Sequence, residues 1–338
     1  MLFRKVMSNL QRTVYVWSEV HNLLPCLRSS LPELNFKQIR LAEECKKCTE
    51  ILPEEIEILK DAEILITDAA VISKILDYIP NMKWVQSTWA GVEAIFQNFD
   101  KSKLPKFIFT KLGNEGFADY MAEYIIAQII INERKFYEMW DDQKENKWTL
   151  RKIERGRLLE NLTVGILGVG AIGKRVAKFL KQRGSIVYGF AKHPRTVEEF
   201  GSFDNIFTDI SELLKQCDYI CNVLPSTSET KGLLNGNTLQ KCLKKPVFIN
   251  IGRGDIIKEA DLIHALNEKW ISRAVLDVFQ TEPLPSDNPL WKTPEVIITP
   301  HIGAITQYHQ VAECFKENYK RFISGRELLY TVDWNKGY

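Results

Sequence analysis

The sequence lacks the features that would place it in a membrane or on nucleic acid. No apolar run reaches the roughly 18 residues that a membrane-spanning helix needs. Neither sign of charge is in excess, since 45 basic residues face 43 acidic ones, for a net charge of +2. A protein that binds nucleic acid through bulk charge needs a clear basic excess. We therefore expect a soluble protein that binds neither membranes nor nucleic acid.

Cysteine is scarce and irregularly spaced. Seven cysteines, an odd number, are scattered over 338 residues. This favours reduced thiols in an intracellular compartment over a disulfide framework. Cys45 and Cys48 form one C-x-x-C, with no second pair to complete the roughly four ligands of a zinc site. We therefore predict no metal site.

The first 13 residues, MLFRKVMSNLQRT, contain basic residues and no acidic one. This pattern resembles an organelle-targeting segment, although it is short and poor in serine. We expect a cytoplasmic protein, with mitochondrial import as the alternative.

From residue 14 onward, short apolar segments alternate with helix-length amphipathic ones. The expected strands are 14–17, 36–41 (a weaker pattern), 63–67, 83–88, 106–110, 162–168, 185–190, 218–224, 246–251, 273–279 and 296–300. Between the two series we expect a long helix at about 117–140 and an exposed connection at 141–158, and near the end a helix at about 304–323. The length and the alternation predict an α/β protein with two doubly wound parallel sheets.

A glycine-rich turn follows the first strand of the second series. GILGVGAIGKRVAKFL (165–180) places Gly168, Gly170 and Gly173 in G-x-G-x-x-G spacing between an apolar strand and an amphipathic helix. In this context the glycines permit a tight turn, close approach of a pyrophosphate, and close packing of helix and strand. We predict a dinucleotide site there that includes the backbone of Ala171 and Ile172. An ordinary structural turn is the alternative.

The segment FAKHPRT (190–196) is basic where an acidic residue usually binds the adenosine ribose. Lys192 and Arg195 can hold a 2′-phosphate that a carboxylate would repel. Each charge-assisted hydrogen bond contributes roughly 1.5–3 kcal/mol. We therefore predict NADP(H) as the preferred cofactor. The alternative is a solvated basic loop that also admits NAD(H).

Three further fragments end predicted strands: NIGRG (250–254), LDVFQTEPLP (276–285) and TPHIG (299–303). Ligands of open parallel sheets bind at the carboxyl ends of the strands. Arg253, Glu282 and His301 are therefore candidates for one site that performs hydride-transfer chemistry.

The chain resembles the D-isomer-specific 2-hydroxyacid dehydrogenase family along nearly its whole length. It is most similar to the glyoxylate/hydroxypyruvate reductases of that family. The matching segments are STWAGVE (87–93), DYMAEY (119–124), the glycine turn, VLPSTSET (223–230), DVFQTEPLPSDNPLW (277–291) and TPHIGAIT (299–306).

The resemblance implies a role for each candidate. His301 would protonate the substrate carbonyl oxygen, Glu282 would orient the His301 ring, and Arg253 would bind the carboxylate and polarise the carbonyl. The substrate carboxylate would also meet the backbone of Trp89, Ala90, Gly91 and Val92. Further cofactor contacts would come from Leu224, Pro225, Ser226, Thr227, Thr230, Ile251, Gly252, Arg253, Asp277, His301 and Gly303.

The resemblance also implies the domain organisation. A Rossmann cofactor domain, 115–301, would be inserted into a discontinuous flavodoxin-like substrate domain, 1–114 with 302–338. Closure of the substrate domain would exclude water. A homodimer would form through the cofactor domain, with the 117–161 region at the interface.

The expected activity is NADPH-dependent reduction of small 2-oxo acids, glyoxylate and hydroxypyruvate first, to D-2-hydroxy acids. Trp89 stands where the family often has a smaller residue, and its ring either restricts substrate size or packs against the domain. A reductase of bulkier 2-keto acids is one alternative. A dinucleotide-sensing interaction protein with little turnover is another.

Overall fold

The computed structural model describes residues 12–40, 51–96, 99–100, 102–113, 115–149, 156–197, 201–335 and 337. Residues 1–11 of the basic N-terminal segment and the Cys45–Cys48 pair lie outside these ranges. Within the described ranges, no helix has the length and apolar character to cross a bilayer.

The chain divides into two compact units. One comprises Met1–Phe117 with Thr306–Tyr338, and the other comprises Ala118–Ile305. The assignment of substrate to the first unit and cofactor to the second remains a prediction from the sequence.

The first unit is built on a five-stranded parallel sheet of order β2-β1-β3-β4-β5. This is the flavodoxin-like strand order. Its elements are β1 (Thr13–Trp17), α2 (Leu23–Ser30), β2 (Asn35–Gln38), α4 (Pro53–Lys60), β3 (Ile64–Thr67), α5 (Ala69–Ile75), η1 (Leu76–Tyr78), β4 (Trp84–Ser87), α6 (Glu93–Phe96), β5 (Ile108–Thr110) and α13 (Tyr308–Ile323).

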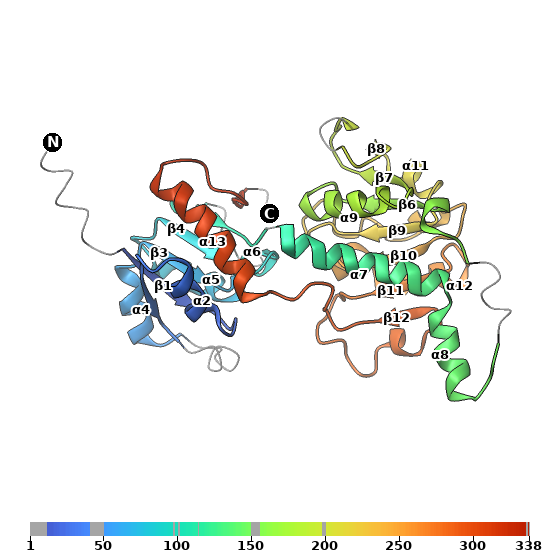
Figure 1. The fold of residues 1–338 in the computed structure, drawn as a ribbon, viewed down its shortest axis with the longest axis horizontal. Coiled ribbons are helices and arrows are strands. Elements are labelled where there is room, and N and C mark those ends of the chain that lie inside the picture. Colours follow the sequence, from blue (N-terminus) through green and yellow to red (C-terminus); the bar gives the residue numbers. More distant parts are fainter. Residues whose placement is uncertain are drawn as a thin grey trace, which may run out of the picture. The chain divides into compact units, whose positions relative to one another are not determined.

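Helices cover both faces of this sheet. Ile64 and Ile66 of β3 belong to one apolar cluster, which contains residues of α2 and α13. Leu65, between them, belongs to a second cluster, with residues of α4, α5 and α6. Figure 1 shows the red C-terminal helix α13 beside the blue and cyan elements of this unit, and Phe315 of α13 stacks on Trp84 of β4. The end of the chain therefore completes the N-terminal core.

The second unit is built on a seven-stranded parallel sheet of order β12-β11-β10-β9-β6-β7-β8 (Figure 1). The order runs in opposite directions from β6, which is the doubly wound pattern of dinucleotide-binding sheets. Its elements are α7 (Glu115–Glu133, entering from the first unit), α8 (Phe136–Lys144), η2 (Leu159–Asn161), β6 (Thr163–Leu167), α9 (Ala171–Lys181), β7 (Ile186–Phe190), β8 (Asn205–Phe207), α11 (Ile210–Leu214), β9 (Tyr219–Asn222), η3 (Thr238–Lys241), β10 (Val247–Asn250), η4 (Gly254–Ile256), α12 (Glu259–Asn267), β11 (Arg273–Leu276), η5 (Pro289–Lys292) and β12 (Val296–Ile298).

The predicted fold class is confirmed, and three details differ. The single helix expected at 117–140 is two helices, α7 and α8, because Lys135 has a left-handed backbone with a φ of 56°. Helix α8 continues to Lys144, into the segment expected to be an exposed connection. The short strand β8 was not expected.

Candidate active site

Two of the three glycines in the turn between β6 and α9 are required by the backbone, and the third borders open space. Gly168 follows β6 with a φ of 110°, a conformation that disfavours other residues. A Cβ on Gly173 would lie 1.9 Å from the carbonyl oxygen of Gly168, so only glycine lets the helix pack against the turn. A Cβ on Gly170 would meet no atom within 4 Å. Gly170 therefore borders open space.

This turn can hold a pyrophosphate. Gly170 is the N-cap of α9 and supplies no side-chain cap. Ala171 and Ile172 begin the helix, where backbone N–H groups have no carbonyl partner within the helix. Such N–H groups and the positive end of the helix dipole bind phosphate groups. The residues present fit a dinucleotide.

Two buried asparagines fix the backbone at the neighbouring strand ends. Asn222 ends β9 and Asn250 ends β10, and the Nδ2 of Asn222 donates to the Oδ1 of Asn250 at 2.8 Å. The Oδ1 of Asn222 accepts from the backbone N–H of Leu224, and the Nδ2 of Asn250 donates to the backbone carbonyl of Arg253. The pair therefore positions the segments that carry Leu224 and Arg253.

The His301 ring is hydrogen-bonded directly to the Glu282 carboxylate. The Nδ1 of His301 lies 2.7 Å from the Oε2 of Glu282, and the Oε1 of Glu282 accepts from the backbone N–H of Phe279 at 2.8 Å. The His301 side chain is half exposed. Because Nδ1 faces the carboxylate, Nε2 is the ring nitrogen left to meet a substrate.

Asp277 shapes the turn that carries His301. Its carboxylate accepts from the backbone N–H groups of Ile302 (2.8 Å) and Gly303 (2.7 Å) and from the Thr299 hydroxyl (2.5 Å). The Tyr124 hydroxyl lies 2.6 Å from the Thr299 oxygen, and burial raises the pKa of Tyr124. Because Thr299 donates to Asp277, Tyr124 must donate to Thr299.

Arg253 is connected to the His301–Glu282 pair through backbone packing. A Cβ on Gly254 would lie 2.0 Å from the carbonyl carbon of Phe279, the residue whose N–H binds Glu282. The Arg253 side chain is half-buried, and its Nη1 donates to the carbonyl of Gly252 at 2.6 Å. The three candidate catalytic residues thus sit on contiguous segments at the carboxyl edge of one sheet.

The predicted cofactor-selecting residues follow β7 and are exposed. Lys192 forms an ion pair with Glu229 of the loop after β9. Within that loop the Ser226 hydroxyl donates to Asp255 at 2.5 Å, and the Thr230 hydroxyl donates to the carbonyl of Pro225 at 2.6 Å. The hydrogen bonds of Ser226 and Thr230 hold the loop after β9 in place. Direct contact of these residues or of Lys192 with a cofactor remains a prediction.

In the first unit, the predicted carboxylate-binding loop follows β4. Trp89 packs against the apolar cluster of α4, α5 and α6. Its N–H donates to the Ser87 hydroxyl, and its carbonyl accepts from the N–H of Leu112. Val92 is buried, whereas Ala90 and Gly91 are half-buried. The ring of Trp89 thus packs against the domain, and its effect on substrate size remains a prediction.

Comparison with known proteins identifies the family of the chain. The sequence profile "D-isomer specific 2-hydroxyacid dehydrogenase, NAD binding domain" matches residues 126–303. A D-isomer specific 2-hydroxyacid dehydrogenase family protein from Aeromonas salmonicida is 30% identical, with 96% of this chain and 99% of that chain covered and a TM-score of 0.79. The chain belongs to the D-isomer specific 2-hydroxyacid dehydrogenase family.

Two further structures are similar to this dehydrogenase. One is a family member from Xanthobacter autotrophicus Py2, solved with NADPH and MES, at 28% identity over 97% of this chain and 100% of that chain, with a TM-score of 0.80. The other is an NADPH-dependent glyoxylate/hydroxypyruvate reductase from Sinorhizobium meliloti, at 23% identity over 97% and 100%, with a TM-score of 0.78. The latter likeness shows the fold alone.

Several residues that shape the candidate site were not identified from the sequence. Asn222 and Asn250 end the apolar runs YICN and VFIN, and a polar residue at the last position of a buried strand was the available signal. Thr299 lies two residues before His301, but the sequence does not indicate that it binds Asp277. Tyr124 comes from α7, far along the chain, and only the fold shows that contact.

Proposed function

We propose that this dehydrogenase uses NADPH to reduce small 2-oxo acids, glyoxylate and hydroxypyruvate first, to D-2-hydroxy acids. The observation that carries the proposal is the His301–Glu282 hydrogen bond on the sheet edge that also carries the glycine turn. A histidine held by a carboxylate is a proton donor suited to neutral pH.

When bound, the nicotinamide supplies the hydride, and the chain's own residues do the rest. Protonated His301 donates a proton from Nε2 to the substrate carbonyl oxygen. Glu282 stabilises the protonated ring through Nδ1 and fixes its orientation. Arg253 leaves the Gly252 carbonyl, pairs with the substrate carboxylate, and stabilises the negative charge that develops on the carbonyl oxygen.

The loop of the first unit would hold the substrate carboxylate through the backbone N–H groups of Ala90, Gly91 and Val92. The packing of Trp89 supports this proposal, because it keeps the loop in one conformation. Activity profiles with branched 2-keto acids, compared between wild type and Trp89→Ala, separate this reading from a reductase of bulkier substrates.

The preference for NADPH rests on Lys192 and Arg195, two exposed cations that follow β7. The relative from Xanthobacter autotrophicus Py2, which was solved with NADPH, supports the same choice. NAD(H) remains the alternative cofactor.

A homodimer is also proposed, through the surface of α7 and α8. Ile130, Phe136 and Trp140 are each about 40–50% exposed there, which is unusual for large apolar side chains on two neighbouring helices. Light scattering on the purified protein would give twice the 39.1 kDa chain mass, and a monomer at micromolar concentration would contradict the dimer.

Replacement of His301 tests the proposed chemistry. We expect His301→Gln to lower kcat for hydroxypyruvate reduction by about 10²–10⁴-fold, because the general acid is lost. His264→Gln is the matched control, since this exposed histidine of α12 has its ring against Trp270 and lies outside the candidate site. Full activity in a folded His301→Gln variant would overturn the mechanism.

A further inference from the structure

An ion pair connects the two loops that flank the glycine turn. Lys192 lies two residues after β7, and Glu229 lies in the loop after β9. In the sheet, β7 and β9 are the two neighbours of β6, the strand that leads into Gly168. The Lys192–Glu229 pair therefore joins the loops on either side of the predicted pyrophosphate site.

Glu229 stands on a braced turn. The hydroxyl of Thr227 accepts from the backbone N–H groups of Glu229 and Thr230, both at 3.3 Å. The Thr230 hydroxyl is in turn anchored on the carbonyl of Pro225. These bonds hold the backbone at Glu229, the residue whose carboxylate pairs with Lys192.

The pair is charged and accessible. The hydrogen bond from Lys192 and the positive charges of Lys192 and His193 hold the pKa of Glu229 below its ordinary value. The side chains of Lys192 and Glu229 are 56% and 53% exposed. Because water screens the charges of an exposed ion pair, Lys192 can leave Glu229 for a stronger anion at little cost. A phosphate group is such an anion.

We propose that Glu229 is a selectivity residue, the counter-ion that Lys192 exchanges for the 2′-phosphate of NADP(H). The inference rests on the proposed role of Lys192 as a phosphate ligand. When Lys192 turns to the phosphate, Glu229 loses its partner, and its negative charge remains beside the new one. With NAD(H) the pair stays closed. Glu229 thus weakens the preference for the phosphorylated cofactor and keeps NAD(H) usable.

Equilibrium binding to the full chain tests this inference without turnover. Isothermal titration with adenosine 2′,5′-bisphosphate and with 5′-AMP gives the ratio of their affinities, which isolates the 2′-phosphate. We expect Glu229→Gln to raise this ratio about two- to fivefold, because an exposed ion pair is weak. Lys192→Gln should lower the ratio about tenfold, because a charge-assisted bond to phosphate is lost.

Glu212→Gln is the matched control. Glu212 pairs with Lys215 at similar exposure on α11, within the same unit. Its loss changes the net charge equally, and we expect no change in the ratio. A change as large as that of Glu229→Gln would show that bulk charge is responsible and would overturn the inference.

The two remaining outcomes distinguish failure of the inference about Glu229 from failure of the proposed phosphate-binding role of Lys192. If Lys192→Gln lowers the ratio but Glu229→Gln leaves it unchanged or lowers it, Glu229 is not a selectivity residue and the NADPH proposal stands. If Lys192→Gln has no effect, the phosphate-binding role of Lys192 fails and the inference fails with it. All four residues of the two pairs are exposed, so the substitutions should leave the fold intact.

Discussion

His301 has a left-handed backbone, with a φ of 54°, which is unusual for a residue with a side chain. Such a conformation costs about 1–3 kcal/mol and persists only when its surroundings impose it. Here Asp277 imposes it: its carbonyl accepts from the N–H of His301, and its carboxylate binds the next two N–H groups. The position of the proposed acid thus depends on a buried carboxylate that need not touch the substrate.

Asp277→Asn tests this dependence. All of the described partners of the Asp277 carboxylate are donors, so the amide group of asparagine would face one of them. We expect a stability loss of about 1–3 kcal/mol and a fall in kcat larger than any change in KM, measured by thermal unfolding and by steady-state kinetics. Unchanged kcat in a folded variant would show that the turn keeps its shape without the carboxylate.

Gly170 and Gly173 allow a paired test of the cofactor turn. Gly173→Ala would push a Cβ into the backbone of Gly168, so we expect a clear drop in melting temperature. Gly170→Ala meets no atom and has a φ of −71°, so the fold should be retained. Its methyl group would instead enter the proposed pyrophosphate space and weaken NADPH binding. Normal affinity in Gly170→Ala would show that the cofactor does not approach there.

At the scale of single residues, the sequence predicts those site residues that belong to short local patterns. The three glycines, Glu282 and His301 could be found because a turn or a strand end is short and local. Asn222 and Asn250 could not, because their pairing depends on two strands that become neighbours only in the folded sheet.

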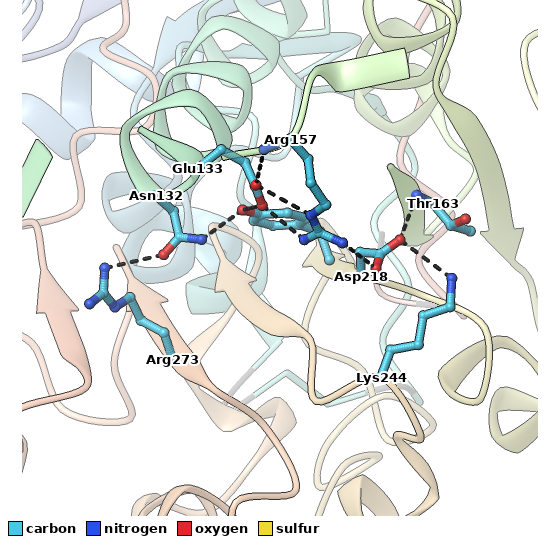
Figure 2. Close-up of polar contacts among 8 residues, drawn as sticks. Asn132, Glu133, Arg157, Thr163, Asp218, Lys244 and Arg273 are labelled. Carbon is cyan, nitrogen blue, oxygen red and sulfur yellow. Dashed lines mark hydrogen bonds and ion pairs between the residues drawn. The ribbon is translucent and has the colours of Figure 1, made fainter. Parts of the chain in front are cut away.

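At the scale of elements, a polar network ties α7 to the sheet of the second unit (Figure 2). The Nη2 of Arg157 lies 2.9 Å from the Oε1 of Glu133 on α7, and its Nη1 lies 2.6 Å from the Oδ1 of Asp218. The Asp218 carboxylate also accepts from the backbone N–H of Thr163. Thr163 begins β6, so the network lies at the amino edge of the parallel sheet, opposite the edge that carries the candidate site. It stabilises the unit away from the chemistry.

Arg157→Met tests this network by stability and its pH dependence. Burial alone would raise the pKa values of Glu133 and Asp218, but the hydrogen bonds of the network, those from Arg157 among them, lower both. A depressed carboxyl pKa contributes stability above its unfolded value, and this is lost as pH falls through the folded value. We expect Arg157→Met to lower the free energy of unfolding by about 1–3 kcal/mol at neutral pH. Below about pH 4.5 the variant should lose less further stability than wild type does.

Arg157→Lys is the control, because it keeps the charge but not the two-pronged geometry. It should lie between wild type and Arg157→Met in denaturant unfolding. Equal stability of all three proteins would show that solvent replaces these contacts without cost.

The break between α7 and α8 shows where element prediction stops. Apolar residues continue on both sides of the break, so periodicity alone favours one helix. Lys135 has a left-handed backbone, which lysine rarely adopts, so sequence propensity does not predict the break. Tertiary packing determines such a boundary.

At the scale of the whole molecule, the alternation of strands and helices was sufficient to predict two parallel sheets. Both sheets have every strand parallel, and their central strands are buried on both faces, which explains why they read as continuous apolar runs. That the last helix joins the first unit could not follow from periodicity, because Phe315 and Trp84 are distant in sequence. The family resemblance supplied it.

The most direct test is steady-state reduction of glyoxylate and hydroxypyruvate by the purified protein, with NADPH and NADH measured side by side. We predict turnover of both 2-oxo acids, with kcat/KM about tenfold higher for NADPH, because cations and not a carboxylate follow β7. Equal rates with NADH would contradict the cofactor assignment. No turnover of either acid with either cofactor would contradict the proposed function itself.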